Sequence, residues 1–314
     1  MKRILICGGS GFIGRNIVEN FSKTKNTKIF STYFKSRKPN IKNVTWIKVD
    51  LRKKSLVYKT LKNIDIVIQS AATTSGAKDI LNTPYLHVTD NAIMNSLLLQ
   101  ASYDLSIKHF IFFSCTVMYP NQKKPIKELE IKNNNSIYKS YFGVAKTKLF
   151  IEDLCKFYSN LSETKYTCIR HSNIYGPHDK FDLNKSHFFG ASVNKVLNCK
   201  NSMKIWGSGH ERRDLLYIDD LVDFVKKAIT KQKKKFRIYN CGYGSHYSVN
   251  QIVNLIKKIS KKKIKIENDL SKPSIKTSLA LNTQLAKKEL GWTKKTNLKK
   301  GISKTISWYK NNYL

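Results

Sequence analysis

Three glycines near the amino terminus have the spacing of a phosphate-binding turn. Gly8, Gly11 and Gly14 follow a short apolar run, and a helical pattern begins within the same segment. Glycines at this spacing allow a tight turn, a close approach of the backbone to a pyrophosphate, and close packing of the helix on the strand. The first N–H groups of the helix, among them those of Phe12 and Ile13, would then point at the phosphates. The segment predicts a nucleotide-binding site.

Further motifs extend this prediction along the chain. They are Asp50-Leu51, Ala71-Ala72, Asn173-Ile174-Tyr175-Gly176-Pro177, Arg213-Asp214, Tyr217-Ile218-Asp219-Asp220 and Leu290-Gly291-Trp292. With the glycine triplet, they make nearly the whole chain similar to the extended short-chain dehydrogenases/reductases, the NAD-dependent epimerase/dehydratase family. Within it, the chain most resembles the GDP-fucose synthases (GDP-4-keto-6-deoxymannose epimerase/reductases) at Tyr119-Pro120, Pro125-Ile126-Lys127-Glu128, Ser186-His187 and Trp206-Gly207-Ser208-Gly209. The resemblance implies an enzyme that acts on a nucleotide-diphosphate sugar with NAD or NADP.

The resemblance also implies which residues hold the dinucleotide. They are Gly8, Gly11, Phe12, Ile13, Gly14, Asp50, Leu51, Ala71, Ala72 and Lys146. Family members that use NAD usually end the second strand with an acid that bonds the ribose 2′-hydroxyl. The stretch 30–37 has no carboxylate here, and its Ser31-Thr32 hydroxyl pair is followed by Lys35 and Arg37, which suit a 2′-phosphate. We therefore expect NADP, contacted by Arg37, with NAD as the alternative.

The proton-transfer motif of the family is interrupted in this chain. The family uses Tyr-x-x-x-Lys on a helix, where the tyrosine exchanges a proton with the sugar and the lysine lowers the tyrosine pKa. Phe142, which has no proton to transfer, stands four residues before Lys146, and Tyr141 stands five before it. On a regular helix the side chains of Tyr141 and Lys146 would point about 140° apart. We expect Tyr141 to serve only where the helix begins late or is distorted.

The hydroxyl position of the family is altered as well. It falls on Cys115, flanked by Ser114 and Thr116. The thiol is a weak donor, a nucleophile or a packed side chain, and Thr116 is an alternative hydroxyl. GDP-fucose synthases epimerise with a cysteine and a histidine. The histidine matches His187, whereas the cysteine position falls on Val117, two residues after Cys115 and on the same side of a continued strand. The candidate catalytic residues are Cys115, Thr116, Tyr141, Lys146 and His187.

Three residues are candidate substrate contacts by the same resemblance. Asn173 matches the asparagine near the substrate phosphates, and Arg213 matches the arginine that clamps the diphosphate, for which a planar bidentate donor fits well. An ion pair of Arg213 with Asp214 or Asp219 is the alternative. Trp206, seven residues before Arg213, would border the nucleotide base. The other histidines have no metal-ligand spacing and the six cysteines form no C-x-x-C pair, so no metal is predicted.

These residues need a scaffold of alternating strands and helices. Apolar runs rich in Ile, Val and Phe predict strands at 3–7, 28–33, 44–49, 64–68, 109–114 and 166–171, and amphipathic stretches predict helices at 11–22, 85–103, 138–158, 221–229, 249–258 and 298–311. This rhythm is typical of an α/β fold with a Rossmann-type doubly wound parallel sheet. We assign residues 1–176 and about 212–232 to that domain. Residues 177–211 and 233–314 are assigned to a smaller C-terminal substrate-binding lobe.

Composition narrows the classes of function. The 314 residues, 41% hydrophobic, exclude a disordered chain or a disulfide-stapled scaffold. Lys+Arg number 58 against 21 for Asp+Glu, a net charge of +37, which we interpret as a lysine-rich solvated surface rather than a polyanion-binding site. No apolar run reaches the ~20 residues of a membrane span. We expect a cytoplasmic protein, a homodimer, with no membrane partner and no specific nucleic-acid partner.

The leading hypothesis is an NAD(P)-dependent oxidoreductase/epimerase that acts on a nucleotide-diphosphate sugar, with a GDP-linked 4-keto sugar as the first candidate. The alternative is a catalytically silent or impaired member of the same family that binds the dinucleotide and the nucleotide sugar. Phe142 and Cys115 favour this alternative. Asn173, Trp206 and Arg213 favour the enzyme.

Overall fold

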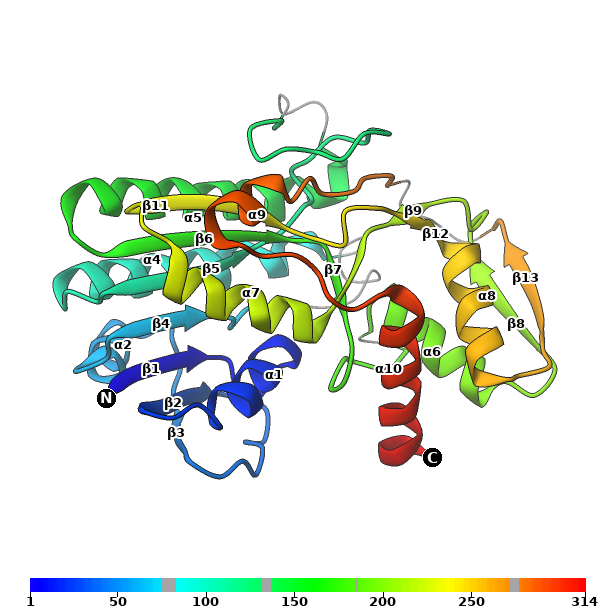
Figure 1. Cartoon of the computed structure of the whole chain (residues 1–314), viewed down its shortest axis with the longest axis horizontal. Coiled ribbons are helices and arrows are strands. Elements are labelled where there is room, and N and C mark those ends of the chain that lie inside the picture. Colours follow the sequence, from blue (N-terminus) through cyan, green and yellow to red (C-terminus); the bar gives the residue numbers. More distant parts are fainter. Residues whose placement is uncertain (75–82, 132–136, 184–185, 272–276) are drawn as a thin grey trace.

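A seven-stranded parallel sheet forms the centre of the molecule. The computed structural model describes residues 1–74, 83–131, 137–183, 186–271 and 277–314. The strand order is β11-β6-β5-β4-β1-β2-β3 (Figure 1), and every neighbouring pair is parallel. The strands are β1 (Lys2–Cys7), β2 (Thr27–Tyr33), β3 (Val44–Lys48), β4 (Ile66–Gln69), β5 (His109–Ser114), β6 (Lys165–His171) and β11 (Phe236–Cys241). Because the order reverses at β1 and β4, their carboxyl ends flank a crevice suited to a ligand.

Helices cover both faces of this sheet. One hydrophobic cluster joins it to α1 (Phe12–Phe21) and α7 (Ile218–Lys231), and a second joins it to α2 (Lys54–Leu61), α4 (Thr89–Asp104) and α5 (Phe142–Leu161). All residues of β4 and β5 are buried, as expected for strands enclosed on two sides. The predicted Rossmann-type doubly wound fold is confirmed.

The C-terminal lobe lies beside the carboxyl ends of the strands (Figure 1). It contains α6 (Phe188–Asn198), β8 (Ser202–Trp206), α8 (Val249–Ser260), β13 (Lys265–Asp269) and α10 (Leu298–Tyr313). Two small strand pairs connect it to the sheet domain: β7 (Asn173–Tyr175) with β10 (Leu215–Tyr217), and β9 (Arg212–Arg213) with β12 (Tyr247–Ser248). The helix α9 (Gln284–Leu290) packs on β11. The lobe therefore borders the crevice.

Two parts of the structure depart from the sequence-based boundaries. The strand β11 pairs with β6, so it belongs to the sheet, and the boundary at residue 233 is wrong for this segment. Its partner lies about 70 residues earlier in the chain, a distance that hydrophobic pattern does not encode. The predicted helix 85–103 is divided into a 3₁₀ turn, η1 (Pro84–His87), and α4. The predicted helix 138–158 is divided into a 3₁₀ turn, η3 (Lys139–Tyr141), and α5.

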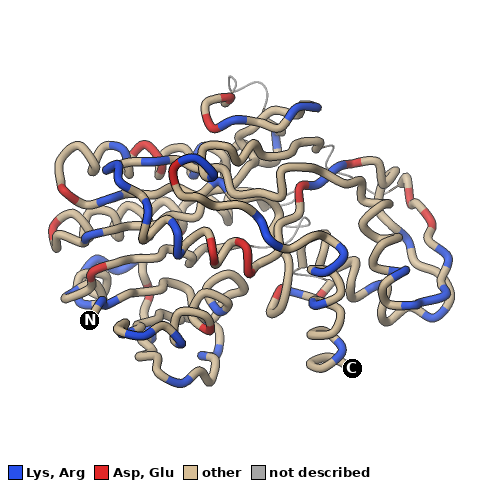
Figure 2. Tube along the Cα trace, viewed as in Figure 1, with Lys and Arg blue, Asp and Glu red and all other residues tan. Residues whose placement is uncertain are grey.

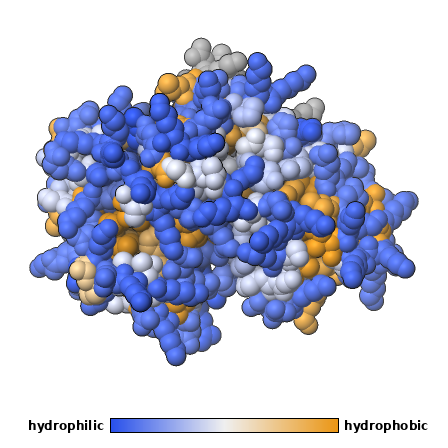
Figure 3. Space-filling view, viewed as in Figure 1, coloured by the Kyte–Doolittle hydropathy of each residue, from blue (hydrophilic) through white to orange (hydrophobic). Residues whose placement is uncertain are grey.

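Charged side chains are spread over both lobes. Figure 2 shows Lys and Arg along the helices and loops of the whole molecule rather than in one stripe. The face in Figure 3 is mostly hydrophilic, with hydrophobic patches between the charged side chains. In the part of the chain that the structure describes, no helix is long and apolar enough to cross a membrane. All six cysteines are free thiols.

Candidate active site

The turn between β1 and α1 is packed too closely for side chains at two of its glycines. A Cβ on Gly8 would lie 2.7 Å from the Ala71 Cα, and a Cβ on Gly14 would lie 2.2 Å from the Gly8 carbonyl oxygen. The Gly8 N–H donates to the Thr32 hydroxyl at 2.9 Å, which fixes the turn to the end of β2. The glycine turn, α1 and the segment after β4, where Ala72 follows Ala71, therefore meet at the crevice.

The start of α1 fits a pyrophosphate. The helix begins at Phe12, no side chain caps it, and Gly11 before it is exposed. The first N–H groups, at Phe12, Ile13 and Gly14, are the donors that a helix leaves without an intrahelical partner. The residues present thus fit a dinucleotide at the predicted place.

The two hydroxyl groups at the end of β2 do not face a ligand, as the sequence had predicted, but bond to the backbone. Ser31 and Thr32 are buried: Ser31 donates to the Ile6 carbonyl at 3.0 Å, and Thr32 accepts the Gly8 N–H. The expectation that this hydroxyl pair suits a 2′-phosphate is wrong, because both hydroxyls serve the fold. Lys35 and Arg37 are exposed.

Asp50 lies in an ion-pair network at the end of β3. The guanidinium of Arg52 donates to both Asp50 oxygens, at 2.9 and 2.8 Å, and also pairs with Asp90. This contact lowers the pKa of the Asp50 carboxyl to about 2, so the carboxylate stays ionised. Leu51 is buried, and the Arg52 guanidinium lies 5.6 Å from the centre of the Phe34 ring.

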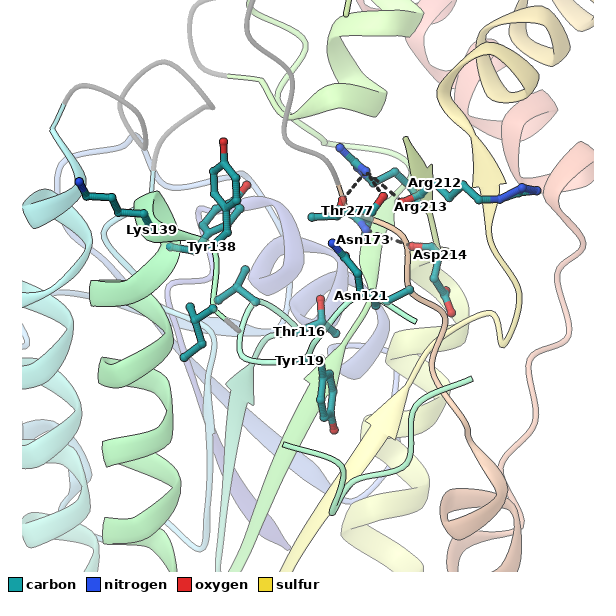
Figure 4. Close-up of a pocket in the computed structure, with 14 residues that line it drawn as sticks. Thr116, Tyr119, Asn121, Tyr138, Lys139, Asn173, Arg212, Arg213, Asp214 and Thr277 are labelled. Carbon is teal, nitrogen blue, oxygen red and sulfur yellow. Dashed lines mark hydrogen bonds between the residues drawn. The ribbon is translucent and has the colours of Figure 1, made fainter. Parts of the chain in front are cut away.

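A cavity of about 480 Å³ lies between the carboxyl edge of the sheet and the C-terminal lobe. Figure 4 shows Arg213, Asn173 and Thr277 on one side of it and Tyr138 on the other, with Thr116 between them. The lining residues are Thr116, Val117, Tyr119, Asn121, Ile137, Tyr138, Lys139, Tyr141, Asn173, Arg212, Arg213, Asp214, Thr277 and Leu279. Four predicted site residues are thus brought together: Thr116, Tyr141, Asn173 and Arg213.

The guanidinium of Arg213 is held by the segment after β13. It donates to the Arg212 carbonyl at 2.9 Å, to the Thr277 carbonyl at 3.2 Å and to the Thr277 hydroxyl. Burial lowers the pKa of Arg213, and Tyr141 opposes that shift, so the two side chains are electrostatic neighbours.

The alternative partners of Arg213 are engaged elsewhere. The Asp214 carboxylate accepts backbone N–H groups of Tyr243, Gly244 and Leu281 at 2.7, 3.1 and 3.0 Å, and Asp219 pairs with Lys304. Asn173 donates to the Asp214 carbonyl at 3.2 Å. The carboxylate of Asp214 therefore fixes the loops around the cavity.

Tyr141 meets the condition set by the sequence, because the helix begins late. The residue lies in η3 and α5 starts only at Phe142. Tyr141 lines the cavity, whereas Phe142 is 45% exposed and is not a lining residue. Burial raises the pKa of Tyr141, and the Arg213 charge acts against this. The Lys146 ammonium lies 5.6 Å from the centre of the Phe142 ring.

Cys115 and His187 do not line this cavity, although Cys115 directly precedes Thr116, which does. The half-buried Cys115 packs in a small cluster with Met118, Ala145 and Tyr141. Burial raises the pKa of its thiol, which the charge of Lys148 partly offsets. His187 directly precedes α6, and desolvation of its ring by burial lowers its pKa, as does the charge of Lys180.

Sequence reasoning missed His171, at the end of β6. Its Nδ1 lies 2.8 Å from the Ser172 carbonyl oxygen, so this nitrogen carries the proton and Nε2 is left as the acceptor. Burial lowers the pKa of His171 to about 4, and Lys148 and His187 act in the same direction. A histidine two residues before Asn173, at the carboxyl end of a strand, is the sequence feature that identifies this position.

Other cavity residues carried no sequence motif. Tyr138, Asn121 and Thr277 line the cavity. Thr277 is 64 residues from Arg213, so only the fold brings them together. Trp206 lies on β8, 47% exposed, with the Lys195 ammonium 5.7 Å from its ring, and it does not line the cavity. Within the described ranges, no group of three or more His, Cys, Asp or Glu residues is arranged to hold a metal ion.

The sheet order, the glycine turn and the cavity at the carboxyl edge define a Rossmann-type nucleotide-binding protein. The family model described as "NAD dependent epimerase/dehydratase family" matches residues 4–242. The chain therefore belongs to this family, as its motifs predicted.

Individual relatives cover nearly the whole chain. It is 29% identical to the GDP-L-colitose synthase of Yersinia pseudotuberculosis over 98% of both chains. It is 25% identical to a GDP-L-fucose synthase of Azorhizobium caulinodans, over 98% of this chain and 96% of that protein. The structure of a Thermotoga maritima UDP-glucose 4-epimerase with UDP-glucose superposes with a TM-score of 0.88 at 23% identity, covering 99% of this chain and 100% of that one, which shows a shared fold.

Proposed function

We propose that the protein is an NADP-dependent oxidoreductase/epimerase that acts on a GDP-linked 4-keto sugar. The observation that carries the proposal is one cavity with a proton-bearing side and an anion-binding side. Tyr141 and Thr116 belong to the first side, and Arg213 and Asn173 to the second. A nucleotide-diphosphate sugar has the complementary arrangement, with a reactive hydroxyl or ketone at one end and a diphosphate at the other.

The chain's own residues would divide the work as follows. Arg213 holds the diphosphate, since a planar guanidinium pairs two ways with phosphate oxygens. Tyr141 exchanges the proton of the sugar O4, and Thr116 donates a hydrogen bond to the same oxygen. Lys146 holds the ribose of the dinucleotide. When bound, the nicotinamide would exchange a hydride with C4 of the sugar.

Epimerisation needs an acid and a base beside the ketone. The proposed pair is Cys115, which directly precedes Thr116 of the cavity lining, and His187, which matches the histidine of the GDP-fucose synthases. The surroundings of His187 favour its neutral form, which is the form that accepts a proton. The surroundings of Cys115 favour the thiol, which is the form that donates one.

The sugar and its nucleotide are proposed from the relatives. The two proteins compared above are named GDP-L-colitose synthase and GDP-L-fucose synthase, which supports a GDP-linked substrate. The proposal of NADP rests on Arg37, which follows β2 with its side chain exposed, and on the absence of a carboxylate in residues 30–37.

Single-turnover nicotinamide absorbance with a GDP-4-keto sugar tests the proposal. We expect wild-type protein to oxidise NADPH, and Tyr141→Phe to slow this step about 100-fold or more, because general acid catalysis contributes about 10²–10⁴. Tyr138→Phe is the matched control, since it removes a neighbouring phenol of the same cavity. Phe142→Tyr restores the family spacing to Lys146, but because Phe142 does not line the cavity, we expect no rise in the rate.

The silent-binder alternative gives a different result. In that case the wild type binds NADPH and the GDP-sugar tightly, yet shows no hydride transfer, and Phe142→Tyr gains none. A loss in Tyr138→Phe together with full activity in Tyr141→Phe would move the proton role to Tyr138.

A further inference from the structure

A lysine on the inner side of α5 reaches the end of the neighbouring strand. The Lys148 ammonium donates to the Phe113 carbonyl of β5 at 2.7 Å and lies 4.6 Å from the centre of the Phe112 ring. Phe113 stands two residues before Cys115. Lys148 thus places its nitrogen beneath the strand end that carries the thiol.

The other charged groups around Cys115 largely cancel. Glu152 on α5 and Arg170 on β6 form a buried bidentate ion pair, with the Arg170 Nε 2.9 Å from one Glu152 oxygen. The charge of Glu152 raises the pKa of the Cys115 thiol, and the charge of Arg170 lowers it. Tyr141 is a further titratable neighbour and stays neutral, because burial raises its pKa. Lys148 is therefore the cation whose charge is left to act on Cys115.

The interaction between Lys148 and Cys115 is mutual. Burial lowers the pKa of the Lys148 ammonium, and Cys115 acts against that shift. Burial raises the pKa of the Cys115 thiol, and the charge of Lys148 is the largest influence that lowers it. An ammonium and a thiolate in surroundings of low polarity stabilise each other, since screening by water is weak there.

The strand register places His171 beside Cys115. Ser114 of β5 pairs with Arg170 of β6, so Cys115 and His171 follow side by side at the carboxyl edge. The His171 ring lies 6.1 Å from the Phe113 ring, centre to centre, and is influenced by the Lys148 charge. The neutral form of this histidine adds no second cation near the thiol.

We propose that Lys148 is a positioning residue of the active site, whose ammonium stabilises the thiolate that Cys115 forms when its thiol gives up a proton. The proposal rests on the proposed function only for the use made of that proton. In an epimerisation, a base takes the proton from the carbon beside the sugar ketone. The S–H bond of Cys115 then breaks as a C–H bond forms on the other face, and the thiolate remains paired with Lys148.

Alkylation of Cys115 measures this effect without substrate or cofactor. Iodoacetamide reacts with the thiolate, so the rate from about pH 6 to about pH 10 reports the thiol pKa. Peptide mass spectrometry separates Cys115 from Cys199, the other partly exposed thiol, which serves as an internal reference. Lys148→Gln removes the charge but keeps N–H donors for the Phe113 carbonyl. We expect Cys115 to react about tenfold more slowly at pH 8 in this variant, which corresponds to a rise of about one unit in pKa.

Three further variants make the result decisive. Lys156→Gln removes the same charge from an exposed position of α5, and both thiols should react as in the wild type. Lys148→Met should lower the alkylation rate of Cys115 as much as Lys148→Gln does. Lys148→Arg keeps a cation, so Cys115 should react at the wild-type rate in that variant. A wild-type rate in Lys148→Gln at every pH overturns the proposal. So does a loss confined to Lys148→Met, because it would assign the effect to the hydrogen bond.

Failure of the proposed function has a separate signature. A protein without hydride transfer would still show the Lys148-dependent thiol reactivity. An active enzyme in which the alkylation rate of Cys115 does not depend on Lys148 would refute the role of Lys148 and leave the proposed function intact.

Discussion

Arg212 and Arg213 are adjacent, yet their guanidinium groups face different surroundings. Arg213 turns into the cavity and donates to Thr277, whereas the Arg212 side chain points the other way (Figure 4). Arg212 donates to the His246 ring at 3.2 Å. Arg213→Lys keeps the charge but loses the planar bidentate donor. We expect GDP-sugar affinity to fall about 10- to 100-fold, the value of about one or two charged hydrogen bonds, with unchanged NADPH affinity.

Calorimetry with GDP-sugar and NADPH measures both affinities. Arg212→Lys is the matched control and should leave both within about threefold. Equal GDP-sugar affinity in wild type and Arg213→Lys would show that Arg213 does not bind the diphosphate.

Cofactor choice depends on the side chains beside the end of β2. The Ser31 and Thr32 hydroxyls are used by the fold, and Arg52 is paired with Asp50 and Asp90. The exposed Arg37 is then the proposed partner of a 2′-phosphate. We expect NADP to bind at least about tenfold more tightly than NAD, the value of one charged hydrogen bond, and Arg37→Ala to narrow this difference.

Titration of both dinucleotides by calorimetry tests this preference. Lys38→Ala removes a neighbouring exposed cation and should not change the ratio. Tenfold tighter binding of NAD to the wild type would contradict the assignment of NADP.

Under the proposed function the β1–α1 turn holds the dinucleotide, and this requires that the parts of the turn stay in contact. A Cβ at position 14 would meet the Gly8 carbonyl oxygen at 2.2 Å, and the backbone cannot move away without opening the turn. We expect Gly14→Ala to lower the free energy of unfolding by about 1–3 kcal/mol and to weaken NADPH binding about tenfold or more. Urea unfolding and calorimetry give the two values.

A second glycine separates binding from stability. Gly291 ends α9 with φ +63°, and nothing lies within 4 Å of a Cβ there. Gly291→Ala should cost about 1 kcal/mol of stability through backbone strain alone and leave NADPH binding intact. Equal loss of NADPH affinity in both variants would mean that the turn at Gly14 has no special role.

At the scale of elements, the sequence predicted the strands better than the ends of the helices. The first six strands were found from their apolar runs, because burial on both faces leaves a strong local pattern. The start of α5 at Phe142 was not predictable, since no capping side chain marks it. That one-residue detail decides whether Tyr141 lines the cavity.

Contacts between distant segments were likewise not predictable from the sequence. The pairing of β11 with β6, the contact of Thr277 with Arg213, and the approach of Lys148 to the end of β5 all depend on the completed fold. Motifs identified the residues at the strand ends. The side chains that hold those residues in place carried no motif, because their spacing is set by packing rather than by local sequence.

The charge of the whole molecule has no single location. With a net charge of +37, Lys and Arg occupy both lobes (Figure 2), as a lysine-rich composition would place them. Such a surface attracts polyanions without specificity, and the attraction falls steeply as salt is added. The anionic ligand of the proposed function meets instead a cavity into which the half-buried Arg213 points (Figure 4).

An apolar surface on α4 and α5 supports the expected homodimer. Both helices pack on one face of the sheet and against each other, and their outer sides expose large apolar residues. These are Ile93 and Tyr103 on α4, and Phe150, Phe157 and Leu161 on α5, each between 37% and 54% exposed. Large apolar side chains exposed on two neighbouring helices suit an interface between copies of the chain, in which a two-fold axis would pair this surface with itself. We expect the wild type to sediment as a dimer and Phe157→Glu as a monomer, because a carboxylate at the centre of an apolar contact is costly to bury.

Tyr313→Glu, at an exposed aromatic residue of the C-terminal lobe, should remain dimeric. Sedimentation velocity at several concentrations decides the matter: a monomeric wild type, or a dimer that Phe157→Glu leaves intact, would exclude this surface as the interface.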